Sequence, residues 1–395
     1  MRDSSVPIRR RRLWPVFVMP ALVVIGAIAW SGFWYYASSM IGAQFDGWRE
    51  REAKSGRVYA CGKLSVGGFP FRFEVTCNDA HIGLRAQTAE QALADVRLGG
   101  ILAVAQIYNP QLLIAEFSGP MSIADRGQPP SLIANWNKSQ ASVYGLPISP
   151  QRASLVLDDP KLDRVTGAVQ APFARAKKLE LHGRLAEGSV NDHPVIDVAL
   201  TLARANAEGL HPLAAEPFDL DAQAQLRGLR DFRPRPWPER FREIQAAGGR
   251  IEIVKSRLLQ GDLIAIAAGS LGISASGYLD GELKMTVAGL DKIVPALGLD
   301  KLAAGEGVPQ ATLDRIAPGL KTRDVDNAMG ALDRLMPGLG GLVRKQAPAA
   351  ITAGITMLGE KTILEGRAAQ SFPLRFVDGA VLLGALRIAQ TPPLF

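Results

Sequence analysis

The sequence predicts an α+β fold in which a curved antiparallel β-sheet predominates, together with an N-terminal transmembrane helix and a helical insertion near the C-terminus. Three observations lead to this class. A run of 24 residues without a charged side chain, from Leu13 to Tyr36, directly follows four arginines. Apolar and polar residues then alternate with period two through much of residues 57–289. In residues 290–358 a period of three to four residues replaces that alternation.

The uncharged run is long enough to cross a membrane. A helix of that length measures about 36 Å, and the hydrocarbon core of a bilayer is roughly 30 Å thick. The arginines at positions 9–12 would keep the N-terminal side in the cytoplasm, because positively charged flanks are retained there. We therefore expect a cytoplasmic basic tail at residues 1–12, a transmembrane signal anchor at residues 13–36, and the bulk of the chain on the other side.

A cleaved signal peptide and a buried soluble helix both fit this run less well. A signal peptide has an apolar region of about 7–15 residues and a small-residue cleavage site, whereas this run is longer and ends in bulky aromatic residues. A buried helix of a soluble protein is disfavoured by Pro15, Pro20 and the arginine cluster. After the anchor, a juxtamembrane helix at residues 37–56 is expected to lead the chain away from the bilayer.

Cys61 and Cys77 are the only cysteines, and both follow shortly after the predicted membrane span. In an oxidising compartment such a pair most simply forms a disulfide. The residues between them predict a hairpin with its turn near Gly67-Gly68. Two free buried thiols are the alternative, and a zinc site would need more ligands than this pair and His81 provide.

The alternating segments predict strands with one apolar and one solvated face, as in antiparallel sheets. Clear examples are residues 179–185, 196–202, 218–226 and 279–287. Residues 249–289 predict four short strands, broken at Gln260-Gly261, Gly269-Ser270 and Gly277. Together these segments define a β-rich periplasmic domain at residues 57–289.

Two segments interrupt the alternation. Residues 233–238 contain three prolines and predict an extended crossover that leads into a short helix at residues 239–247. Residues 290–358 predict a helical insertion of three or four short helices separated by Pro-Gly steps. Strand character returns after the insertion, so residues 359–395 are expected to complete the sheet.

Charge and motif content argue against several functions. Five basic and one acidic residue in the first 12 positions give +4, and the remaining 40 basic and 37 acidic residues give +3 of the total +7. The basic charge is therefore mainly in the tail, and nucleic-acid binding is not expected. The sequence has no P-loop, dinucleotide, G-x-S-x-G or H-E-x-x-H motif. His182 falls on the polar face of its strand, and we predict no catalytic residue, no cofactor and no metal site.

Short motifs near both ends of the chain resemble a known family. Cys61 is followed by Gly67–Phe73 (GGFPFRF), and Phe372–Gly379 (FPLRFVDG) occurs near the end. We interpret both Phe-Pro motifs as the starts of similar strands. With the basic anchor, they resemble an uncharacterised envelope family of Gram-negative bacteria, domain-of-unknown-function family 2125, over essentially the whole chain. This resemblance implies a single-pass protein of the bacterial inner membrane, and it brings no catalytic residues.

A more distant likeness is to AsmA-like proteins, in which short strands also alternate with glycine turns, as in Gly248–Gly289 here. That likeness implies a curved β-groove with an apolar interior that shields lipid acyl chains. The groove would be lined by apolar residues of the alternating strands: Phe71, Phe73, Val75, Leu220, Leu226, Leu283, Met285 and Val287.

Three classes of function therefore remain. The first is binding or shielding of phospholipid or another hydrophobic ligand in a membrane-anchored β-groove. The second is an envelope assembly or scaffold protein that binds a protein partner through the proline-rich crossover and the helical insertion. The third is a hydrolase whose site forms only on folding. The first class requires the apolar strand faces to line an accessible trough rather than meet in a closed core.

Overall fold

The computed structural model describes most of the chain. The described ranges are residues 14–54, 56–84, 94–125, 128–146, 149–187, 189, 193–209, 212–232, 237–290, 359–383 and 386–395. The predicted basic tail, all but the first residue of the predicted insertion at 290–358, and residues 233–236 of the predicted crossover lie outside them.

The first element is one continuous helix, α1 (Trp14–Lys54), which combines the predicted anchor with most of the predicted juxtamembrane helix. From Phe17 onward it is long and apolar enough to cross a membrane, and only 6% of its apolar 18-residue window is buried. A core helix of a soluble protein would be mostly buried. The exposed apolar surface therefore argues against such a core helix.

Twenty strands in the described ranges form one antiparallel sheet. The first ten are β1 (Arg57–Ala60), β2 (Lys63–Gly67), β3 (Arg72–Leu84), β4 (Ala94–Gln106), β5 (Asn109–Asp125), β6 (Leu132–Asn135), β7 (Lys138–Tyr144), β8 (Arg152–Asp158), β9 (Lys161–Thr166) and β10 (Val169–Arg175). The others are β11 (Lys178–Leu185), β12 (Ile196–Ala205), β13 (Phe218–Leu226), β14 (Ile251–Gln260), β15 (Leu263–Ile273), β16 (Leu279–Ala288), β17 (Glu360–Leu364), β18 (Arg367–Val377), β19 (Ala380–Leu383) and β20 (Leu386–Gln390). A short helix, α2 (Trp237–Ala246), connects β13 to β14 close to where the sequence predicts it.

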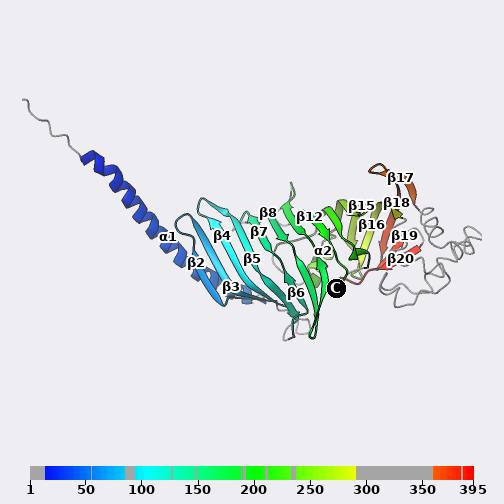
Figure 1. The fold of residues 1–395 in the computed structure, drawn as a ribbon, viewed down its shortest axis with the longest axis horizontal. Helices are drawn as coiled ribbons and strands as arrows, with labels where there is room; N and C mark the ends of the chain where they lie inside the picture. The colour runs from blue at the N-terminus through cyan, green and yellow to red at the C-terminus, as the bar shows by residue number, and fades with distance from the viewer. Residues whose placement is uncertain are drawn as a thin grey trace, which may run out of the picture.

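The order of strands in the sheet nearly follows the order in the sequence (Figure 1). The main run of hydrogen-bonded neighbours is β2–β3–β4–β5–β7–β8–β11–β12–β13–β14–β15–β16–β18–β19–β20. β1 pairs with β3, β17 pairs with β18, and β6, β9 and β10 branch from β5. α1 lies at one end of the curved sheet and β17–β20 lie at the other (Figure 1). The predicted class, a large antiparallel sheet with an N-terminal apolar helix, is confirmed, whereas nearly all of the predicted helical insertion lies outside the described residues.

One predicted strand break is wrong. Gly269-Ser270 does not end a strand, because β15 runs unbroken through it and β14–β16 are three strands rather than four. Gly269 has φ +149°, and a Cβ there would overlap the carbonyl oxygen of Glu282 in β16 and lie 2.8 Å from Leu283 Cα. The glycine is thus required for close approach of two strands, which sequence alone does not distinguish from a turn.

The second Phe-Pro motif also differs from its interpretation. Pro373 lies in the middle of β18, opposite Lys284 of β16, rather than at the start of a strand. On the other side of β18, pairing with β17 extends only as far as Ser371, and pairing with β19 starts at Leu374. Pro373 therefore lies in the gap between the β17 and β19 pairings, where its missing N–H is tolerated.

Burial is concentrated at the two ends of the sheet. At the C-terminal end Phe372, Leu374 and Leu383 form a buried cluster on which Leu283 and Met285 pack. At the N-terminal end Cys77, Ala80 and Leu98 form another, joined by partly buried neighbours that include Cys61, Ile101 and Trp136. Between them, fully buried apolar side chains are few among the described residues.

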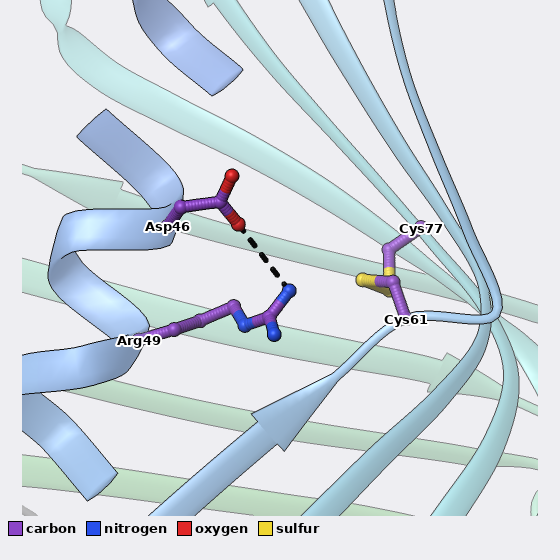
Figure 2. Close-up of a disulfide and its surroundings, with 4 residues drawn as sticks. All are labelled: Asp46, Arg49, Cys61 and Cys77. Atoms are coloured by element: carbon purple, nitrogen blue, oxygen red, sulfur yellow. Dashed lines mark hydrogen bonds and ion pairs between the residues drawn. A yellow bond between two sulfur atoms is a disulfide. The ribbon is translucent and has the colours of Figure 1, made fainter. Parts of the chain in front are cut away.

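The predicted disulfide between Cys61 and Cys77 is confirmed (Figure 2). Cys61 lies in the short break between β1 and β2, and Cys77 lies in β3, with which both of those strands pair. The Cα atoms are 5.4 Å apart, and Cys77 is only 8% exposed. The disulfide holds the connection between β1 and β2 against β3, the strand with which both of them pair.

We expect the double variant Cys61→Ser/Cys77→Ser to lose about 3 kcal/mol of unfolding free energy, because the closed loop of about 15 residues restricts the unfolded chain. Urea unfolding of the full chain in detergent measures the loss. Mass analysis without reductant should find the native chain two hydrogens lighter than the reduced chain. Free labelling of both native thiols would contradict the assignment.

Gly269→Ala should destabilise the sheet by about 3 kcal/mol or more, because the new methyl group would overlap the backbone of β16. Gly183→Ala is the control, since its Cβ would meet only Ile196 Cγ2 at 3.8 Å, an ordinary contact in a strand. We expect that control to change stability by less than about 1 kcal/mol. Equal midpoints of urea unfolding for the two variants would refute the close approach.

Candidate functional site

The predicted groove residues are related by the strand register. Directly paired residues of antiparallel strands project on the same side of a sheet. Starting at Phe73, successive pairs cross thirteen strands without meeting a polar residue. This row is Phe73, Ala105, Leu113, Val143, Ala153, Gly183, Val198, Ala224, Ile253, Gly269, Leu283, Leu374 and Leu383. Phe73 and Leu283, 210 positions apart in the numbering, therefore share one row.

Two further rows run beside the first. One is Val75, Ala103, Ala115, Ala141, Leu155, Leu181, Leu200, Ala222, Ser256, Ala267, Met285 and Phe372. The other is Leu157, Leu179, Leu202, Leu220, Leu258, Ala265 and Val287. We call the surface made by these three rows the apolar face.

Seven of the eight predicted residues lie on the apolar face. Six belong to the three rows, and Leu226 lies two residues beyond Ala224 in the same strand. Phe71 does not, because it precedes β3 in the turn and is 64% exposed. The register thus brings together residues from both ends of the sequence, but it does not test whether they bind a ligand.

The apolar face is open in its middle and closed at its C-terminal end. No side chain of β8, β11 or β13 is buried, and Leu181, in the centre of the second row, is 40% exposed. By contrast, Val287 and Phe372 are each only 2% exposed. A closed core would bury the central leucines as fully as these two residues. The middle of the face is therefore accessible.

The opposite face of the same strands is polar. A depression of about 490 Å³ on β8, β11, β12 and β13 is lined by residues that include His182, Ser154 and Gln223, together with residues of the first row that lie between them in sequence, such as Gly183. Arg184 Nε donates to Asp197 Oδ2 at 3.1 Å across two of these strands. Sequence alternation placed His182 on this face but carried no signal for the depression.

Ser154, His182 and Glu180 are neighbours but do not form a hydrolytic triad. His182 Nδ1 is 2.9 Å from Ser154 Oγ, whereas its Nε2 is 3.7 Å from Glu180 Oε2, too far for a hydrogen bond. The hydrogen bond from the Lys178 ammonium lowers the pKa of the Glu180 carboxyl, with Lys178 Nζ 2.5 Å from Glu180 Oε1. Because the acid is held by Lys178, it does not orient the imidazole as such a triad requires.

The helix α1 packs against the N-terminal end of the sheet through aromatic side chains. Trp34, only 4% exposed, stacks on Phe73 with ring centroids 5.7 Å apart, and its Nε1 donates to Arg72 O at 3.1 Å. About four helical turns further along α1, Trp48 packs on Tyr59 of β1 with ring centroids 4.6 Å apart. The first residue of the first apolar row, Phe73, is therefore in contact with the predicted anchor.

Sequence reasoning missed these contacts for a simple reason. Aromatic residues at the end of an apolar run are typical of membrane interfaces, so no sequence signal indicated that Trp34 packs on protein. Most of β4 was also missed, because residues 99–105 are apolar on both faces and show no alternation.

The fold and this face describe a protein with an N-terminal apolar helix and a large antiparallel sheet that is apolar on one side. A family model for uncharacterised proteins conserved in bacteria, DUF2125, matches residues 34–392. The chain belongs to this family. No curated protein matches it. The comparisons give no support for the more distant likeness to AsmA-like proteins.

The accessibility of the face predicts different outcomes for two aspartate substitutions. Leu181→Asp should leave the protein folded, because a carboxylate at a 40% exposed position stays hydrated. Val287→Asp should unfold the C-terminal end, because a buried unpaired carboxylate is very costly. Circular dichroism and urea unfolding compare them, and unfolding of both variants would indicate a closed core.

Proposed function

We propose that this protein is held in the bacterial inner membrane by α1, with its sheet in the periplasm, and that the apolar face binds or shields the acyl chains of a lipid or similar hydrophobic ligand. The half-exposed middle of the apolar face carries this proposal. Exposed hydrocarbon costs roughly 25 cal/mol per Å², so a ligand that covers these rows gains free energy. An extended acyl chain suits a long strip that offers almost no hydrogen-bonding side chains.

The location is supported by several features. Basic residues precede the apolar helix, and the disulfide suits an oxidising compartment. The helix is more consistent with a retained anchor than with a cleaved signal peptide. Cleavage near Ala37 would remove Trp34, the side chain that stacks on Phe73.

We propose no catalytic role. On the polar face His182 is within hydrogen-bonding distance of Ser154, but Glu180 is held by Lys178 and lies too far from the imidazole to orient it. The scaffold alternative draws on residues 233–238 and 290–358, which mostly lie outside the described ranges, so no structural observation favours it.

The test is photo-crosslinking in living cells. A benzophenone amino acid replaces Leu181 on the apolar face, and the control replaces Gln223, an exposed residue on the opposite face. After irradiation the purified protein is examined by mass spectrometry. We expect phospholipid adducts at position 181 and few or none at 223. Leu181→Asp should lower lipid co-purification several-fold, while Gln223→Asp should not.

Two results would overturn the proposal. Equal lipid labelling at both positions would mean that the contact is not specific to the apolar face. A protein adduct at position 181, without lipid, would mean that this face binds a partner and would favour the scaffold function.

A further inference from the structure

The turn between β2 and β3, residues Gly67–Arg72, is tied to α1 by hydrogen bonds. Trp30 Nε1 donates to Pro70 O at 2.9 Å, one helical turn before the Trp34 bond to Arg72 O. Tyr35 also stacks on Phe69 with ring centroids 5.9 Å apart. The turn therefore lies beside α1 at the level of residues 30–35.

Counting residues along α1 puts that level at the edge of the hydrocarbon core of a membrane that this helix would cross. Twenty helical residues cross a core of roughly 30 Å, and twenty residues counted from Trp14, the first residue of α1, end at Phe33. Trp30 then lies just inside the boundary and Trp34 just beyond it. Because Pro70 is within hydrogen-bonding distance of Trp30, it shares that depth.

The turn has the composition of an interfacial segment. Residues 67–71 carry no charge, Phe69 is 48% exposed and Phe71 is 64% exposed. The β4–β5 turn lies next to it, since Ile107 N donates to Phe71 O at 3.1 Å, and Tyr108 in that turn is 75% exposed. Aromatic side chains of this kind are enriched at membrane–water interfaces.

We infer that the β2–β3 turn, together with Tyr108, is inserted into the interface of the leaflet on the sheet's side of the membrane that α1 crosses. The partner is the bilayer itself, at the boundary between headgroups and acyl chains. Arg72, 58% exposed at its side chain, follows the aromatic residues, where its guanidinium can remain among the headgroups.

This insertion also gives the apolar face a source of ligand, a consequence that rests on the proposed function. The first row of the apolar face starts at Phe73, two residues beyond Phe71. An acyl chain leaving the leaflet beside the turn reaches that row without crossing open water. The lipid would then come from the same membrane that holds the anchor.

The test uses the full chain in vesicles of phosphatidylcholine and phosphatidylglycerol, with the native disulfide oxidised. A single added cysteine carries an environment-sensitive fluorophore in Phe71→Cys, Tyr108→Cys or the control Ile363→Cys. Ile363 is 76% exposed on β17, at the end of the sheet opposite α1 (Figure 1). Lipids that carry a spin label near the headgroup quench fluorophores at the interface.

We expect at least two-fold stronger lipid quenching at positions 71 and 108 than at 363, and stronger quenching by aqueous iodide at 363. Similar quenching at all three positions would overturn the inference. Tyr108→Cys is a check on a folding artefact at position 71, because Tyr108 is 75% exposed and its replacement removes little packing. The quenching measurement needs no bound ligand, so it can detect insertion of the turn even if crosslinking at position 181 yields no lipid. Crosslinking of lipid at position 181 without quenching at positions 71 and 108 would support the proposed function and contradict the insertion.

Discussion

The structure depends on keeping one face of the sheet apolar across strands that come from the whole length of the chain. Side chains alternate with period two, so a slip of one residue in any pair would turn that strand's apolar set toward solvent. Where the alternation of apolar and polar residues changes along a strand, a β-bulge restores the apolar residues to the same face. In β14 the even-numbered residues Leu258 and Ser256 lie on the apolar face, and beyond them the odd-numbered Ile253 and Ile251 do. A β-bulge at Val254 inserts the one extra residue that this change requires. Without it both isoleucines would face the polar side.

The second constraint is the attachment of α1. A single-pass helix alone leaves the domain after it free to take many orientations. Trp34 and Trp48 remove much of that freedom, because they pack about four helical turns apart against β3 and β1. Trp30 adds a hydrogen bond to the first turn of the main sheet run. The direction in which the sheet leaves the helix is thus set by aromatic contacts between segments that are close in sequence.

These two constraints explain which features of the fold could be predicted from the sequence and which could not. Where one face is solvated the alternation is clean, and β13 begins at Phe218 and ends at Leu226, as the pattern predicts. The disulfide was predictable because Cys61 and Cys77 are the only cysteines and both follow closely after the predicted membrane span. Features that depend on a neighbour in space were missed: the close approach at Gly269, the change of partner at Pro373 and the burial of Trp34. Each has a local sequence that equally suits a turn, a strand start or a membrane interface.

Burial is distributed unevenly along the apolar face. A soluble sheet of this size would be expected to cover its hydrocarbon with a second layer, because that burial is the main favourable term in folding. Here Val287 and Phe372 at one end are buried, Phe73 at the other end is covered by Trp34, and the leucines between them are only partly shielded. The face is therefore closed at its far end, contacts the apolar helix at its near end and is accessible between. This asymmetry supports our proposal that the strip accepts hydrocarbon from the membrane side and is not an unfinished core.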